Sequence, residues 1–287
     1  MNTPKYIVQT QTKSSAISAV LIALLVIVLA LVPLFASRST LQDLFFILTM
    51  LSLAQLWNLL AGFGGLVSVG QQAFVGLGAY IFFGSVALWD LPLLPAILLG
   101  GMAALLLAIP TAYFAFRLQG AYFAIATWVI AEVTRLSISM WKQLGGGTGA
   151  TLSRDVRGGK IVTWVSEALD LRVSAAMDVV AYWLALVLTT AIIFGLYRLL
   201  CSRNGLALAA VRDNPDAATS VGVDATALKW KVFLIAAFGT GLAGALIYLQ
   251  KGRISPDAAF SVIDWSAYVI FIVIIGGIGT IEGPILG

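Results

Sequence analysis

Long apolar runs separated by short polar connections make up most of this chain. A hydrocarbon core about 30 Å thick needs roughly 20 residues of helix to cross it, so each run predicts one membrane span. The runs lie near residues 17–35, 44–62, 73–89, 95–116, 121–140, 177–200, 230–250 and 265–287. We therefore expect an all-α fold: a polytopic bundle of about eight transmembrane helices, one of them glycine-broken, that forms a single membrane domain over residues 1–287.

The first apolar run has two interpretations. Lys5 and Lys13 precede it and LFASRS follows it, as in a secretory signal peptide. Its apolar stretch is longer than the roughly 7–15 residues of a signal-peptide core. We therefore expect a helix that is not cleaved.

The distribution of lysine and arginine predicts that both ends of the chain are cytoplasmic. In this orientation the cytoplasmic side receives Lys5, Lys13, Arg117, Arg203, Arg212 and Lys229. Two connections are longer than a turn, an outer excursion over about 141–176 and a cytoplasmic loop over about 201–229. The excursion conflicts with this rule, since it holds Lys142, Arg154, Arg157, Lys160 and Arg172. Long polar loops obey the rule only weakly.

The outer excursion opens with the glycine-rich sequence LGGGTGATL. Glycines in such a stretch predict a loop with several positive φ angles. A surface helix is expected after it, around Val162–Leu169.

A second group of glycines interrupts the chain at membrane depth, in NLLAGFGGLVSVGQQAFVGLGAY. Backbone groups freed by such a break must face protein or water, because lipid cannot bond them. We predict that this segment lines a translocation pathway, with Gly70 at a positive φ angle; the lining residues would be Gly65, Gly70, Gln71, Gln72 and Phe74. The alternative is close helix packing in which the two amides bond neighbouring helices.

Glu132 and Arg135 are an acid and a base well inside one predicted span. Ionisable groups at that depth favour a functional site, so both are candidates for the pathway. Residues at i and i+3 of a helix can also neutralise each other, and Arg135 could extend to the outer surface. These structural roles are the alternative.

Composition excludes several other classes of protein. The chain is 60% hydrophobic and 10% charged, with a net charge of +4, and offers no nucleic-acid patch. It has no histidine and one cysteine, Cys201, which excludes imidazole chemistry, an internal disulfide and a thiolate metal cluster. GTGLAG, residues 239–244, fits a dinucleotide fingerprint but lies inside an apolar run, which favours helix packing. No GxxxxGK[ST] motif occurs, so any ATP that drives the protein is bound by another chain.

The cytoplasmic loop contains a compact polar insert, AAVRDNPDAATSVGVDATALKWK, between two apolar runs. Asn214 suits a helix N-cap, Pro215 its first position, Asp216 its positive end and Gly222 its C-terminal stop. Asp224 then caps the next long helix. A helix of about two turns is unstable alone, so a partner or the membrane domain must hold it.

Four stretches of the chain together resemble the LivM-type permeases of branched-chain amino acid ABC importers. They are GGLVSVGQQAFVGLGAY, RLQGAYFAIATWVIAEVTRL, GLALAAVRDNPDAATSVGVDATALKWKVFLIAAFGTGLAGAL and IIGGIGTIEGPILG. The resemblance runs from about Asn58 to Gly287 and implies a LivH-like second permease, two cytoplasmic ATPases of LivG and LivF type, and a periplasmic binding protein.

Within the insert, DAATSVG is similar to the EAA-xxx-G signature of importer coupling loops, with Asp216 in place of Glu. The resemblance therefore implies that the insert contacts an ATPase. The residues concerned are Arg212, Asp213, Asn214, Pro215, Asp216, Ala217, Ala218 and Gly222. It also implies a further hydrophobic stretch and a polar tail beyond GPILG, whereas the sequence ends at Gly287; a short chain, a truncation and a fragment are the alternatives.

The sequence thus predicts a permease subunit of an ATP-driven importer in a bacterial inner membrane, without catalytic residues, cofactor or metal of its own. Branched-chain or related hydrophobic amino acids are the expected solutes. Urea and short amides are the alternative within the family. An ion-coupled secondary transporter is the alternative outside it, and would need more intramembrane carboxylates than Glu132 alone.

Overall fold

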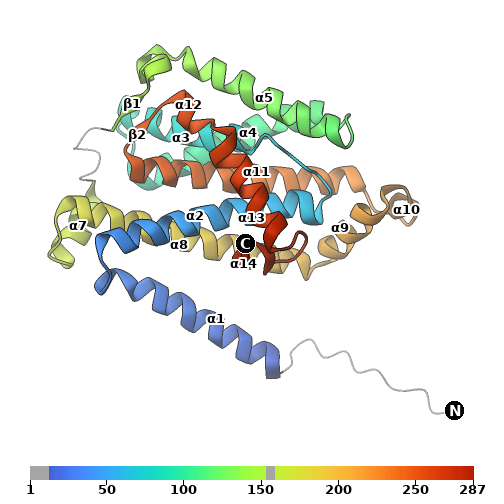
Figure 1. Cartoon of the computed structure of the whole chain (residues 1–287), viewed down its shortest axis with the longest axis horizontal. Coiled ribbons are helices and arrows are strands. Elements are labelled where there is room, and N and C mark those ends of the chain that lie inside the picture. The colour runs from blue at the N-terminus through green and yellow to red at the C-terminus, as the bar shows by residue number, and fades with distance from the viewer. Residues whose placement is uncertain (1–12, 153–158) are drawn as a thin grey trace.

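Figure 1 shows the computed structural model, which describes residues 13–152 and 159–287. Seven of its helical segments are long and apolar enough to cross a membrane. They are Arg38–Phe63, Gln71–Trp89, Leu93–Ala115, Ala121–Ser139, Val173–Leu200, Ala225–Lys251 and Pro256–Gly276. The protein is therefore a multi-pass membrane protein with an almost wholly helical fold, as its apolar runs predict.

The first of these spans is α2 (Arg38–Asn58), which continues into a π-helix, η2 (Leu59–Phe63). The middle spans are α3 (Gln71–Trp89), α4 (Leu93–Ala115), α5 (Ala121–Ser139), α8 (Val173–Leu200) and α11 (Ala225–Lys251). The last is built from α12 (Pro256–Ala259), a second π-helix, η5 (Ile263–Ala267), and α13 (Tyr268–Gly276). The first six follow the predicted runs closely.

The remaining predicted span, 17–35, corresponds to α1 (Lys13–Leu31) and the short 3-10 helix η1 (Val32–Leu34). Its described apolar stretch, Val20–Leu34, is shorter than the other seven. Figure 1 shows α1 apart from the bundle. It is joined to α8 near its end, where Tyr182 and Trp183 donate hydrogen bonds to the carbonyls of Leu29 and Ala30 at 2.8 and 3.0 Å.

The limits predicted for the last span, 265–287, are wrong at both ends. The helical segment begins at Pro256 and ends at Gly276. Gly277 and Gly279, with φ angles of +117° and +83°, then turn the chain, and a short helix, α14 (Gly283–Leu286), follows. The sequence IIGGIGTIEGPILG is apolar enough to read as membrane helix, but its glycines adopt left-handed conformations that end one.

The centre of the bundle is the close packing of α3, α4 and α11. A Cβ on Gly241 would lie 2.5 Å from the Cβ of Ala104, and one on Gly244 would lie 2.8 Å from the carbonyl carbon of Val75. Small residues let these backbones approach closely, which is how membrane helices associate. GTGLAG is thus a helix-packing motif, as predicted.

The outer excursion folds against the segment before the last span. It contains two 3-10 turns, η3 (Lys142–Leu144) and η4 (Gly146–Thr148), then β1 (Ala150–Thr151) and the helix α7 (Lys160–Ala168). β1 pairs antiparallel with β2 (Arg253–Ile254), with Ala150 opposite Ile254. The positive φ angles of Gly145, Gly146 and Gly149 and the surface helix confirm the predictions for this stretch. Lys5, Arg154 and Arg157, used to predict the orientation, lie outside the described residues.

Candidate functional sites

The predicted coupling insert consists of two helices, α9 (Arg203–Asp213) and α10 (Pro215–Ser220), at one end of the bundle in Figure 1. The Oδ1 atom of Asn214 accepts hydrogen bonds from the backbone of Asp216 and Ala217 at 3.1 and 3.0 Å. Gly222 follows α10 with a φ angle of +88°, and the backbone N–H of Val223 donates to the carbonyl of Ala218 at 3.1 Å. The predicted N-cap and C-terminal stop are confirmed.

The surface of α10 is small and mostly polar. Asp213, Asn214, Pro215, Asp216 and Ala217 are all exposed. Ala218 is 3% exposed and packs into the cluster of buried residues at this end of the bundle. Of the two alanines that the family resemblance places in the ATPase contact, only Ala217 therefore lies on the surface.

An open depression of about 340 Å³ lies beside α10, lined by Thr219, Gly222, Val223, Asp224, Ala225 and Thr226. Its lining residues run from the end of α10 to the start of α11.

Arg212 points toward its own chain as well as toward solvent. Its Nη1 donates to the carbonyl of Gly62 in η2, which continues α2, at 3.1 Å, and its Nε donates to Asp213 at 3.2 Å. The ion pair with Asp213 is exposed, so it contributes little stability. Arg212, which the family resemblance places in the ATPase contact, therefore also links the insert to a membrane helix of its own chain.

The glycine-broken segment returns from the end of α2 toward the middle of the bundle. After η2 the chain is non-helical from Gly64 to Gly70, and α3 begins at Gln71. Gly65, with a φ angle of +66°, lies beside Arg212. Trp57 donates to the carbonyl of Ser68 at 2.8 Å, and the N–H of Val69 donates to Thr127 of α5 at 3.2 Å. Side chains thus bond part of this backbone, as backbone that lies away from water requires.

The residues at the end of this segment are buried. Gln71 donates to the carbonyl of Leu53 at 3.1 Å and to the hydroxyl of Thr240 at 3.2 Å, and Gln72 accepts from the hydroxyl of Ser266. Both amides are at most 2% exposed, and Phe74 is 4% exposed. These amides bond neighbouring helices, which was the packing alternative.

The expected positive φ angle at Gly70 is wrong, since φ is −105°. A side chain is excluded there by space instead. A Cβ on Gly70 would lie against the carbonyl of Thr127, 2.7 Å from its carbon atom and 2.9 Å from the Cβ of that threonine. Close approach to α5 therefore requires glycine at this position.

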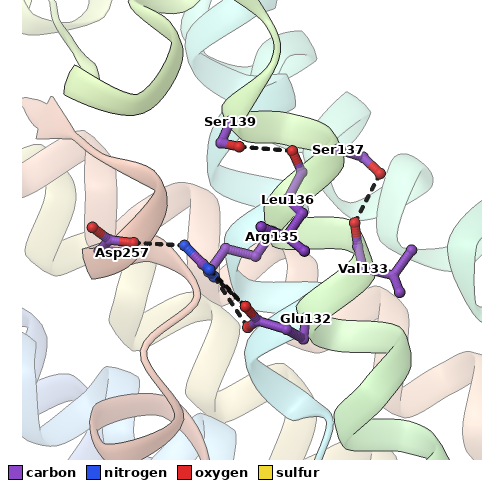
Figure 2. A network of polar contacts seen from close by, with 7 residues as sticks. All are labelled: Glu132, Val133, Arg135, Leu136, Ser137, Ser139 and Asp257. Atoms are coloured by element: carbon purple, nitrogen blue, oxygen red, sulfur yellow. Dashed lines mark hydrogen bonds and ion pairs between the residues drawn. The ribbon is translucent and has the colours of Figure 1, made fainter.

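Three ionised side chains meet between α5 and α12 (Figure 2). The guanidinium of Arg135 donates from Nε to both oxygens of Glu132 at 3.0 Å, and from Nη1 to Asp257 of α12 at 2.7 Å. The side chains of Arg135, Glu132 and Asp257 are 25%, 47% and 84% exposed. Ser137 and Ser139 bond only carbonyls of their own helix. We call these three residues the α5 charge cluster; two carboxylates and one guanidinium give it a net charge of −1.

The structure does not bring the two predicted groups of pathway residues into one site. Gly70, Gln71 and Gln72 lie inside the bundle, whereas Glu132 and Arg135 lie on its surface. The two groups are connected through α5. Thr127 of this helix contacts the glycine-broken segment, and Glu132 follows slightly more than one turn later in the same helix.

Comparison with protein families gives a match over residues 37–287 to the model described as branched-chain amino acid transport system / permease component. The chain belongs to this permease family. It is also similar to the high-affinity branched-chain amino acid transport system permease protein LivM of Salmonella typhimurium, at 31% identity, and of Escherichia coli, at 30% identity. Each match includes 91% of the chain and 63% of the relative. No solved structure matches.

The sequence reasoning missed several polar residues of this chain. Asp257 lies outside every predicted span, so nothing indicated its contact with Arg135. Asp178 is 6% exposed and pairs with Arg38 across α8 and α2 at 2.5 Å. An acid inside one apolar run and an arginine before another could have suggested that pair. Gln55 and Asn58 are fully buried and bond the loop after α13.

Proposed function

We propose that this chain is the membrane-spanning permease subunit of an ATP-driven importer for branched-chain or related hydrophobic amino acids, in a bacterial inner membrane. The observation that carries the proposal is the family match over residues 37–287. The similarity to LivM supports the solute class. In this proposal the chain contributes no catalytic residue, and ATP is hydrolysed on partner chains.

The proposed assembly contains a LivH-like second permease, two ATPases of LivG and LivF type, and a periplasmic binding protein. The α9–α10 insert is the surface proposed to contact an ATPase, and its rigid ends support that role. The outer excursion, on the opposite side in the predicted orientation, is proposed to contact the binding protein. Membrane lipid covers the remaining apolar surface.

The translocation pathway is proposed to run along the α5 charge cluster. Among the seven described segments of spanning length, α5 is the least enclosed, with 17% of its apolar window buried against 78% for α11. Ionised side chains avoid lipid and favour water or a protein partner, which supports a pathway between this face and the second permease. The buried residues Gly70, Gln71, Gln72 and Phe74 would then shape the pathway by fixing the helices behind it, and the exposed Gly65 would place the turn that precedes them.

ATP-dependent uptake by the assembled transporter tests the proposed function. We expect proteoliposomes that contain the chain with its two ATPases and second permease to accumulate leucine when ATP and the binding protein are supplied. Uptake should survive ionophores that dissipate ion gradients. Uptake driven by an ion gradient without ATP would instead identify a secondary transporter, and uptake of urea or acetamide in place of leucine would favour the alternative solutes.

Asp257→Asn tests the pathway. The substitution removes the net charge of the α5 charge cluster but keeps an oxygen that can accept from Arg135. We expect uptake to fall roughly three- to ten-fold, because a hydrogen bond to a charged group contributes about 1.5–3 kcal/mol when enclosed and less when exposed. Assembly and the melting temperature in detergent should not change. Asp43→Asn, at another exposed acid, is the control, and equal uptake by both variants would contradict a pathway at this cluster.

A further inference from the structure

Three segments that are far apart in the sequence converge on Arg212. They are the end of α9, the end of α2 at η2, and the loop of residues 277–282 between α13 and α14. Nη1 of Arg212 donates to the carbonyl of Gly62 at 3.1 Å, and a Cβ on Gly279 would lie 3.3 Å from the same nitrogen. A Cβ added to Gly65 would lie 3.8 Å from the Cγ of Arg212. The arginine thus lies in a notch between glycines of two membrane-domain segments.

The carbonyl that Arg212 contacts is free because the helix ends there. In η2 the bonds are shifted, so that the N–H of Gly64 donates to Leu59 and that of Leu66 donates to Leu60. The last carbonyls of a helix have no partner within it, and they favour a cation. Arg212 supplies both a donor and a positive charge at this end of α2.

The loop of residues 277–282 is held to the same helix by two buried amides. The Oδ1 of Asn58 accepts from the N–H of Gly279 at 2.8 Å, and its Nδ2 donates to the carbonyl of Thr280 at 2.7 Å. One turn earlier, Gln55 donates to the carbonyl of Ile281 at 2.7 Å. Three successive loop residues are therefore bonded to one face of α2.

We propose that Arg212 and Asn58 are positioning residues that transmit movement of the α9–α10 insert to the end of α2 and, through the loop of residues 277–282, to α13. This inference rests on the proposed function, in which an ATPase moves the insert. Hydrogen bonds are short and directional, so a shift of α9 must either move Gly62 or break its bond to Arg212. Since Asn58 bonds the loop only one turn from Gly62, movement of α2 there moves the loop as well.

The test compares transport per ATP hydrolysed in the reconstituted complex. We expect Arg212→Ala and Asn58→Ala to assemble and to hydrolyse ATP within about two-fold of the unmodified complex. Solute transported per ATP should fall at least about five-fold, the lower end of coupling effects between sites. Arg198→Ala is the control, since Arg198 is exposed at the end of α8, outside the α9–α10 insert, and its side chain makes no hydrogen bond to a described residue. Arg212→Lys keeps one cationic donor group, which can bond Gly62 or Asp213 but not both at once, so it should lower the transport per ATP hydrolysed less than Arg212→Ala does. It also provides a test if Arg212→Ala fails to assemble.

A second measurement follows the loop directly. Ile278 is 49% exposed, so Ile278→Cys in a Cys201→Ser background reports the accessibility of the loop to a thiol reagent. We expect its labelling rate to respond to ATP, and Arg212→Ala to abolish that response. Three outcomes would overturn the inference. The first is a normal ratio of solute transported to ATP hydrolysed in Arg212→Ala, and the second is a labelling response to ATP that persists in this variant. The third is a parallel loss of assembly, ATP hydrolysis and transport in both Arg212 variants. An unmodified complex without ATP-dependent uptake would overturn the proposed function, and this inference with it.

Discussion

Ala217→Trp is expected to abolish coupled uptake by the assembled transporter while leaving the folded chain intact. Ala217 is exposed on α10, whose ends are fixed by Asn214, Pro215 and Gly222. A rigid element with a small face can fit closely against an ATPase, and an indole placed there adds bulk at the centre of the contact. Over-packing typically costs about 1–3 kcal/mol, so we expect at least about a five-fold loss of uptake per ATP hydrolysed.

Neighbouring positions provide matched controls for this prediction. Ala218 is 3% exposed, so Ala218→Trp should destabilise the insert itself and lower the melting temperature. Asp213→Asn removes only an exposed charge and should change uptake less than about two-fold, because exposed ion pairs contribute about 0.2–1 kcal/mol. The measurements are ATP hydrolysis, leucine uptake and thermal stability of the reconstituted complex. Normal coupling in an assembled Ala217→Trp complex would refute an ATPase contact at α10.

Gly70→Val is expected to prevent folding, and so to remove assembly and transport together. Its φ angle of −105° is one that valine adopts, so backbone strain is not the cause. The added Cβ would meet the backbone of Thr127, 2.7 Å from its carbonyl carbon, and backbone atoms cannot move aside as a flexible side chain can. We expect the free energy of unfolding to fall by about 3 kcal/mol or more, which is the upper end of the cost of over-packing a core.

Gly195→Val is the control for Gly70→Val, because Gly195 lies in a membrane helix with open space around its Cβ position. The folded fraction after detergent extraction and the melting temperature measure the effect. We expect Gly195→Val to resemble the unmodified chain. Full assembly of Gly70→Val with loss of transport alone would instead restore Gly70 to the lining of the pathway.

The sequence by itself determined the features that depend on local chemistry. Apolar runs of spanning length predicted the membrane helices, because a span must satisfy its own backbone and meet lipid along its length. Asn214, Pro215 and Gly222 predicted the ends of α10, since caps act within a few residues. The family resemblance followed from four motifs in order, and the family match confirms it.

Only the tertiary structure decided which polar groups meet. In a membrane protein, lipid-facing and buried surfaces are both apolar, so hydropathy could not show that Gln71 and Gln72 point into the bundle. Asp257 reaches Arg135 across 122 residues of sequence, and Arg212 reaches Gly62 across 150. The end of the last helix was likewise decided by the left-handed glycines 277 and 279 and the amides of α2. Each of these contacts depends on packing between segments that are distant in the sequence. The residues next to each side chain do not indicate which distant group it will contact.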